Sequence, residues 1–585
     1  MIIPNFSTEA SPSAKWITQL IGNIRETGAK AIFLEVGVSP QVAEQIAKEA
    51  DIKVVTEKEY PLPYKTNWRN FMKKIPLPVQ ASRGNGYRHM LSILKDYRKT
   101  AVILALGLIT LTMLSCLPYA PQGPFDARDY TRIAGIRVEQ HPWVALIEPL
   151  AAPFLILSGA PDFLRACIAL LTWMLLGTAA WAMIAGLRAW KGKKPLAVVL
   201  KGVRGALVVS STMVLIIFLF VVGRIPGWRL VVNAPDLIVA DLHSHTTKSH
   251  DAIVSLRTNL QWHASCGHNL VGLTEHDQFF AHELDAPANP SIDWLPTFIS
   301  GVEAHGGQRS MLLGLCQNSH VQFEKFEVAE YPDRAAWFAK KIHEECGGAV
   351  ISLTLKRLAS GDIARLTDDG VDAFEIVNSG HPEMRPDLRQ EVLDTCRSRG
   401  IPLVATTDWH GWTGLARTWT LIKAPGMSAL SHSQQANLVI RKLREHDSGD
   451  FIPVVAGYMG DPSLIRAIFS PIAETVRYSM ELSTARIISW WVWVWAVFAL
   501  WVFLERKGLQ AGGILLDLVV SITAFGLIAA GLSQIREGIV GSVAPYPIHI
   551  GLVTVAFGAA VFGYSTIRWV GFLRRRHNLK ATVNV

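Results

Sequence analysis

The sequence predicts an α/β barrel inserted between two groups of three transmembrane α-helices. Three observations lead to this fold class. Six apolar runs are each long enough to cross a bilayer, strand-like and helix-like segments alternate through residues 237–465, and a dense histidine cluster opens that stretch. Half of the 585 residues are hydrophobic, which is unusual for a soluble protein of this size.

The apolar runs predict helices that cross the membrane, since a span takes about 20 residues at a rise of about 1.5 Å per residue. The predicted transmembrane regions are residues 100–224 and 486–568. Within them the six runs are 101–118, 164–187, 205–223, 487–504, 513–532 and 548–567.

Residues 144–159 are also apolar, but this run is short and contains Glu148, Pro149 and Pro153. If it crossed the membrane, the positively charged segment 188–204 would move to the outside. We therefore expect a re-entrant or interfacial segment, and a seventh span is the alternative.

Lysine and arginine concentrate before the first span, between the second and third spans, and after the sixth. Loops rich in these residues stay in the cytoplasm. We expect an integral protein of the cell (inner) membrane, with residues 1–99 and the basic tail 569–585 cytoplasmic and residues 237–465 extracytoplasmic. The net charge of +9 is explained by these flanks. The expected partner is the lipid bilayer, and no nucleic acid is expected.

The N-terminal region 1–99 contains a short β–α–β pattern. Residues 31–36 and 52–55 are predicted as strands and residues 40–50 as a helix. Residues 33–40 resemble the end of metal-type ABC substrate-binding proteins, although the segment holds no metal ligands. The alternative interpretation is a small cytoplasmic appendage.

Residues 237–465 alternate short apolar strands with helix-like segments. The predicted helices are 335–345 and 385–399. The predicted strands are 237–240, 270–273, 298–301, 349–352, 373–376 and 403–406. Such alternation implies a parallel sheet or barrel whose functional groups lie at the carboxyl ends of the strands.

Six of the 18 histidines lie between His243 and His276. Side chains alternate along a strand, so His243 and His245 point to the same face and can hold one ion. Glu303 and Asp408 follow two other predicted strands. The pattern predicts a metal site with more than one ion, and surface histidines around a loop are the alternative.

Five motifs in this region follow one another in an order that is typical of one protein superfamily. They are residues 241–246 (DLHSHT), 274–277 (TEHD), 301–303 (GVE), 371–378 (VDAFEIVN) and 407–410 (TDWH). On these motifs the region resembles the PHP (polymerase and histidinol phosphatase) superfamily of metal-dependent phosphoesterases. The resemblance implies a distorted (β/α)7 barrel with up to three metal ions at its mouth.

The resemblance also implies the ligands of divalent zinc, manganese or iron. They are His243, His245, Glu303 and Asp408 for one ion, and His250, His276 and His410 for a second. His250 stands where the family has an aspartate, and Asp251 replaces it if the loop shifts by one residue.

Met311 and Thr354 stand where the family often has histidines that serve the middle metal. We therefore expect two ions or one rather than three. His305 and His381 are alternative ligands, and an ordinary polar role for each is the simpler interpretation.

Together these features predict a membrane-anchored, metal-dependent hydrolase, most specifically a phosphoesterase, acting on a phosphorylated or ester-containing envelope substrate outside the cytoplasm. Ions in such a site lower the pKa of bound water to about 7, and no side chain is assigned as catalytic. One alternative is a non-catalytic membrane receptor or assembly protein that binds metal or ligand, and another is a transporter. The six cysteines form no C-x-x-C pair, and their pairing is left open.

Overall fold

The computed structural model describes 17 stretches of the chain. They are residues 31–33, 53–55, 97–117, 123–160, 163–192, 196–224, 228–276, 295–305, 310–316, 334–353, 358–379, 386–412, 416–457, 464–507, 509, 511–541 and 546–583. The chain forms two compact units, Met1–Ser92 and Ile93–Val585.

In the first unit, strand β1 (Ala31–Phe33) pairs in parallel with strand β2 (Lys53–Val55). Both predicted strands are therefore confirmed. The helix predicted between them lies outside the described residues.

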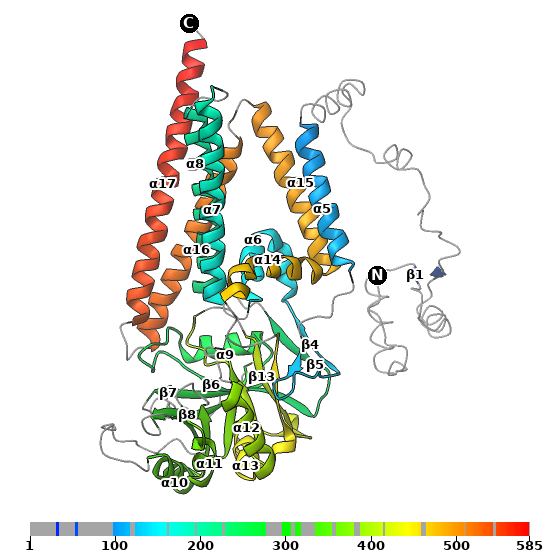
Figure 1. Ribbon diagram of the computed structural model, residues 1–585, viewed down its shortest axis with the longest axis vertical. Coiled ribbons are helices and arrows are strands. Elements are labelled where there is room, and N and C mark those ends of the chain that lie inside the picture. Colours follow the sequence, from blue (N-terminus) through cyan, green and yellow to red (C-terminus); the bar gives the residue numbers. More distant parts are fainter. Residues whose placement is uncertain are drawn as a thin grey trace. The chain divides into compact units, whose positions relative to one another are not determined.

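Six helices of the second unit are long and apolar enough to cross a membrane, judged by length and composition (Figure 1). They confirm the apolar runs found in the sequence. The helices are α5 (Arg98–Ser115), α7 (Phe163–Trp190), α8 (Leu196–Val222), α15 (Thr484–Arg506), α16 (Ala511–Gly541) and α17 (Tyr546–Val583).

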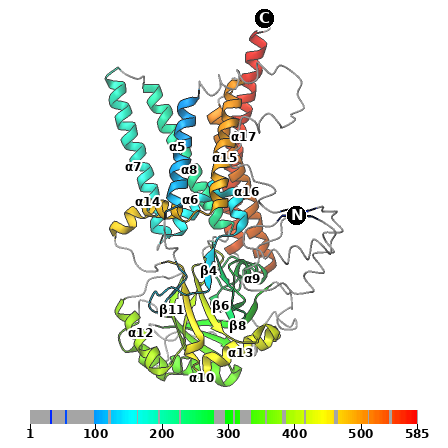
Figure 2. The ribbon, with the colours of Figure 1, turned by 90° about the vertical axis from the view of Figure 1, so that its right-hand side faces the viewer.

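Three shorter helices lie between the long helices and the sheet. The run at 144–159 forms the 3-10 helix η1 (Pro142–Ile147) and α6 (Glu148–Ser158). At about 1.5 Å per residue, α6 is too short to cross a bilayer. Helix α14 (Leu464–Met480) runs across the long helices in both views (Figures 1 and 2).

The rest of this unit is built on a curled ten-stranded sheet. Its strands, in the order in which they lie side by side, are β12 (Leu403–Thr406), β11 (Ala373–Asn378), β10 (Ala349–Leu353), β9 (Met311–Cys316), β8 (Thr297–His305), β7 (Leu270–His276), β6 (Leu237–Ser244), β13 (Thr418–Lys423), β14 (Phe451–Val455) and β3 (Phe125–Asp126). All six predicted strands are among them.

The sheet is mixed, so the expectation of a purely parallel arrangement was wrong. Strands β6, β7 and β8 run parallel, but β9 runs antiparallel to both β8 and β10. Only five residues, 306–310, separate β8 from β9. A parallel neighbour needs a crossover of a dozen or more residues, so this short connection permits only a hairpin.

The sheet curls until its first strand, β12, lies beside β6, β13 and β14. The hydroxyl of Thr420 on β13 donates to the carbonyl of Ala405 on β12 (2.8 Å), and Ser244 forms a parallel bridge with Trp409. This closure brings the end of β6 and the segment after β12 together, although Ser244 and Trp409 are 165 positions apart in sequence.

Helices cover the outer face of the sheet and close one end of its interior. Apolar side chains of α10, α11 and α12 pack on one face, and those of α13 pack on the other. These helices and turns are α9 (Leu256–Ser265), α10 (Arg334–Cys346), α11 (Asp362–Asp368), α12 (Pro386–Arg399), η3 (Met427–Ala429), α13 (His432–Arg444) and η4 (Ser448–Asp450).

The sheet domain extends beyond the predicted range 237–465. Strand β3, from the segment after α5, pairs with β14, and β4 (Ile136–Glu139) pairs with β5 (Arg229–Val232). A disulfide between Cys316 and Cys346 joins the end of β9 to the end of α10.

Gly272 allows β6 and β7 to approach each other. A Cβ atom at this position would lie 2.7 Å from the carbonyl oxygen of Leu242. We expect Gly272→Ala to lower the free energy of unfolding by about 1–3 kcal/mol, because the two strands must separate. Thermal unfolding of the purified chain measures this. Gly449→Ala, where no atom lies within 4 Å, is the matched control, and equal stability of the two variants would contradict the packing argument.

Candidate metal centre

Four ligand-type atoms converge at the carboxyl ends of β6 and β8 and just after β12. The Nε2 atoms of His243 and His245 lie 3.1 Å apart. The Oε2 atom of Glu303 lies 3.4 and 3.2 Å from them, and the Oδ1 atom of Asp408 lies 3.2 Å from each. His243, His245 and Glu303 are buried, and the side chain of Asp408 is only 8% exposed.

These distances fit a transition-metal ion. A tetrahedron whose edges measure about 3.3 Å has its corners about 2.0 Å from its centre, which is the length of zinc–nitrogen and zinc–oxygen bonds. Two imidazoles and two carboxylates also suit zinc, manganese or iron. The structure thus brings together the four side chains predicted for the first ion.

A second group of candidate ligands shares Glu303 with the first. The Nδ1 atom of His276 lies 3.3 Å from Oε2 of Glu303. The carboxylate of Asp251 lies 3.4 Å from Nε2 of His276 and 3.4 Å from Nε2 of His410. Oδ1 of Asp251 and Nε2 of His276 are buried atoms without a hydrogen-bond partner, as expected of ligands to an ion.

His250 occupies a different place from Asp251. Its side chain is exposed, and its ring centroid lies 5.0 Å from that of His276. It forms a group of possible metal ligands with Asp251 and His276.

A β-bulge near the end of β6 aims His243 and His245 at the site. The register between β6 and β7 shifts between Asp241 and Ser244. Asp241 and Ser244 both bind side chains of α9, namely His263 and Asn259, on the outer face of the sheet. His243 and His245 point instead into the interior, because a bulge re-aims the side chains that follow it.

Two further carboxylates hold the first two histidines in place. The Oε2 atom of Glu375 lies 3.2 Å from Nδ1 of His243 and also accepts the hydroxyl of Thr406. Nδ1 of His245 contacts the hydroxyl of Ser249 (3.1 Å), which donates to Glu275 (2.6 Å). Both arrangements leave the Nε2 atoms facing the candidate ion.

Asp241 fastens the site to its surroundings. Its buried carboxylate accepts hydrogen bonds from the backbone amides of His243 (3.2 Å) and Thr407 (3.1 Å). It also lies 2.8 Å from Nε2 of His263. Burial opposes the ionisation of Asp241, but His263, His268 and the hydroxyl of Thr407 outweigh it and hold its pKa below the usual value. The residue after Thr407, Asp408, adopts a left-handed backbone conformation with φ of 52°.

The carboxylates give the site a strong affinity for positive charge. Burial lowers the pKa of His243, but the charge of Asp408 and the hydrogen bonds of Glu303 and Glu375 raise it well above its usual value. Asp408 and Glu303 likewise outweigh burial at His245 and raise its pKa to about 9. Conversely, the histidines hold the pKa values of Glu303 and Asp408 below their usual range despite burial.

The residues considered as substitutes for the missing ligands of a third metal ion do not lie in the cluster. His305 is exposed at the end of β8 and belongs to no candidate metal group of the described residues. His381 and Thr354 lie outside those residues. Met311 packs against the apolar core of the sheet.

Sequence reasoning placed Glu375 and Asp241 in motifs but gave them no role, and it assigned none to Glu275, Ser249 or His263. The alternation of side chains along β11 could have identified Glu375. Its neighbours Phe374 and Ile376 belong to the apolar core on the outer face of the sheet. Glu375 must therefore point inward.

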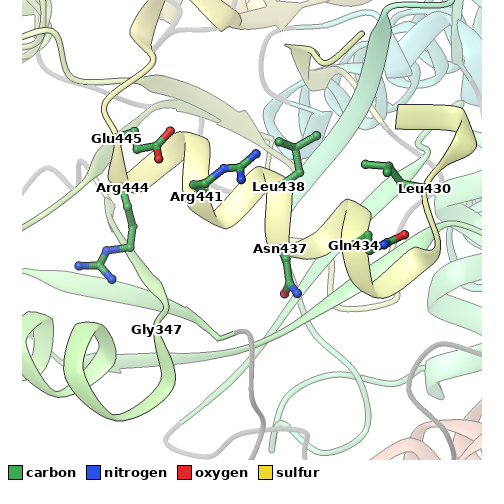
Figure 3. Close-up of a pocket in the computed structure, with 8 residues that line it drawn as sticks. All are labelled: Gly347, Leu430, Gln434, Asn437, Leu438, Arg441, Arg444 and Glu445. Atoms are coloured by element: carbon green, nitrogen blue, oxygen red, sulfur yellow. The ribbon is translucent and has the colours of Figure 1, made fainter. Parts of the chain in front are cut away.

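A cavity of about 710 Å³ lies beside α13 and the turn before β10 (Figure 3). It is lined by Gly347, which precedes β10, and by α13 residues that include Asn437, Arg441 and Arg444. No candidate metal group of the described residues lies there. The cavity is therefore separate from the metal centre.

Comparisons with known proteins bear on two parts of the chain. A family model described as "ZnuA: Zinc-uptake complex component A periplasmic" matches residues 1–75. The chain has a distant structural neighbour, an amidohydrolase from Chromobacterium violaceum solved with bound sulfate and no metal. The two chains are 15% identical, the match covers 32% of this chain and 88% of that one, and the TM-score is 0.21. No curated protein matches the chain.

The orientation of His243 by Glu375 has a measurable consequence. We expect Glu375→Gln to weaken Zn²⁺ or Mn²⁺ binding by about 10–100-fold, because an amide neither orients the imidazole nor raises its basicity as a carboxylate does. Competition with a chromophoric chelator measures the affinity. Glu344→Gln, an exposed change on α10, is the control, and unchanged affinity in Glu375→Gln would contradict the assigned role.

Proposed function

We propose that the chain is a membrane-anchored, metal-dependent hydrolase of the PHP superfamily that cleaves phosphate esters. One observation carries the proposal: Oε2 of Glu303 lies 3.4 Å from Nε2 of His243 and 3.3 Å from Nδ1 of His276, at one edge of a curled sheet. A carboxylate in this place would serve two ions, and paired ions about 3.5–4 Å apart are used for displacement at phosphorus.

Seven side chains would hold the ions. His243, His245 and Asp408 serve the first, His276, His410 and Asp251 the second, and Glu303 both. We infer Asp251 rather than His250, because its carboxylate lies 3.4 Å from both His276 and His410. Bound divalent ions supply a water of lowered pKa and neutralise charge that develops on the phosphoryl oxygens.

The chain's own residues prepare the site for this chemistry. A proton on Nδ1 of His243 is held by Glu375, and a proton on Nδ1 of His245 is held by Ser249, so each Nε2 keeps its lone pair. Asp251, whose side chain is 42% exposed, lies on the solvent-exposed side of the site. His243 and His245 are buried and lie on its inner side.

The membrane arrangement follows from the long helices. We propose that α5, α7 and α8 cross before the sheet domain and that α15, α16 and α17 cross after it. The family model that matches residues 1–75 is described as periplasmic, whereas the distribution of Lys and Arg favours a cytoplasmic N-terminal region. The Cys316–Cys346 disulfide and the distribution of Lys and Arg together favour an extracytoplasmic sheet domain.

Removing His243 and His245 tests the proposed function. We expect His243→Ala with His245→Ala to abolish binding of the first ion and to lower hydrolysis of 4-nitrophenyl phosphate and bis(4-nitrophenyl) phosphate to background. The full chain is assayed with Mn²⁺ or Zn²⁺, and metal content is measured separately. His305→Ala is the matched control. Turnover retained by the double variant would refute a metal-dependent hydrolase, and an inactive parent chain that binds metal would favour a receptor.

Labelling of single cysteines in intact cells tests the orientation. We expect a membrane-impermeant maleimide to label Gly449→Cys, which is exposed at the surface of the sheet domain. Lys194→Cys, between α7 and α8, should react only after the cells are permeabilised. The parent chain gives the background, and the reverse pattern would place the sheet domain in the cytoplasm.

A further inference from the structure

The metal-bearing edge of the sheet faces the ends of the apolar helices. Helix α9 begins beside α16: the carboxylate of Glu537 accepts the backbone amide of Ser255 and the hydroxyl of Thr258, both at 2.7 Å. Both views place α9 next to the ends of α16 and α17 (Figures 1 and 2). A carboxylate at a helix N-terminus is also favoured by the helix dipole.

Two more contacts come from the segment that follows the ligands Asp408 and His410. The ring of Trp412 packs edge-on against that of Tyr546, the first residue of α17, with centroids 6.2 Å apart. The buried guanidinium of Arg417 donates to the carbonyls of Gly159 and Ala160, just after α6. The metal-bearing edge of the sheet thus contacts the helices at three separate places.

The open side of the site lies within reach of these contacts. Side chains of His276 and His410 are 21% and 19% exposed and that of Asp251 is 42% exposed, whereas His243 and His245 are fully buried. His410 is two residues from Trp412, a separation of at most about 7 Å along the chain. The entrance therefore opens near the ends of α16 and α17.

Helix α14 exposes a largely apolar face. Most of its exposed side chains are apolar, among them Leu464, Ile465, Ile468, Phe469, Ile472 and Val476, while Arg466 and Thr475 are its exposed polar residues. Its polar side chains Glu474 and Arg477 are buried and paired with each other. This distribution is the reverse of that of a helix at a water-exposed surface and suits one lying in the bilayer interface.

We propose that the site acts on a phosphate ester carried by a membrane lipid, whose acyl chains stay in the bilayer during the reaction. This inference rests on the proposed function. Water adds to phosphorus, the ester P–O bond breaks, the lipid-borne oxygen takes a proton and remains in the membrane, and the phosphate product leaves toward the aqueous side. The ends of α16 and α17, Trp412 and Tyr546 form the approach from the bilayer to the ions.

The approach is tested by cross-linking, which does not depend on turnover. The full chain is placed in nanodiscs of phosphatidylcholine with phosphatidic acid, and a photoreactive phenylalanine analogue replaces Trp412 or, as the matched control, Asn437 on α13. We expect lipid adducts at position 412 and none at position 437. Absence of adducts at 412, or equal yields at both positions, would overturn the proposed approach. Trp412→Phe confirms that the fold tolerates the change.

Activity distinguishes a lipid-borne phosphate from a free one. Phosphatidic acid and phosphatidylglycerol in the nanodisc are compared with glycerol 3-phosphate and glycerophosphoglycerol in solution. We expect kcat/KM at least tenfold higher for the lipid substrates. Equal or faster cleavage of the soluble esters would overturn the inference and leave the hydrolase standing. No cleavage of any phosphate ester would overturn the proposed function and this inference with it.

Discussion

The candidate metal centre exists because β6 is joined to the segment that follows β12. Asp241 makes this joint: its carboxylate binds the amide of His243 on one side and Thr407 on the other. The amide of Asp408 then donates to the carbonyl of His243 (2.9 Å), which places an acidic ligand beside the two histidines. A buried carboxylate is stable only when hydrogen bonds or charges compensate its lost hydration, and here it has both.

The same principle governs the ligands themselves. Glu303, Asp408 and Glu375 lie together in the interior with few water contacts. Such a group of carboxylates is costly unless positive charge accompanies it, which explains why the histidine pKa values rise. Divalent cations can provide that charge instead of protons. Metal binding and the stability of this edge of the sheet are therefore coupled.

The sequence predicted those features that depend on local patterns. Apolar runs located the long helices and six strands, and the position of Glu303 and Asp408 after strands anticipated their meeting with His243 and His245. The antiparallel course of β9 was not anticipated, since it depends on the length of one connection. Neither was the geometry of Asp251, which depends on how Ser249 and Glu275 fold the loop. The contact between Ser255 and Glu537 spans 282 residues and no local pattern encodes it.

Strand β3 has a consequence for how this protein is made. The outer edge of β14 is covered by residues 125–126, which leave the ribosome long before β14 itself and on the far side of two hydrophobic helices. Strand β3 can pair with β14 only after the intervening chain, including α7 and α8, has been made. Excised on its own, the sheet domain would expose an unpaired strand edge, which is a template for aggregation. The long helices are therefore a folding requirement for the sheet domain.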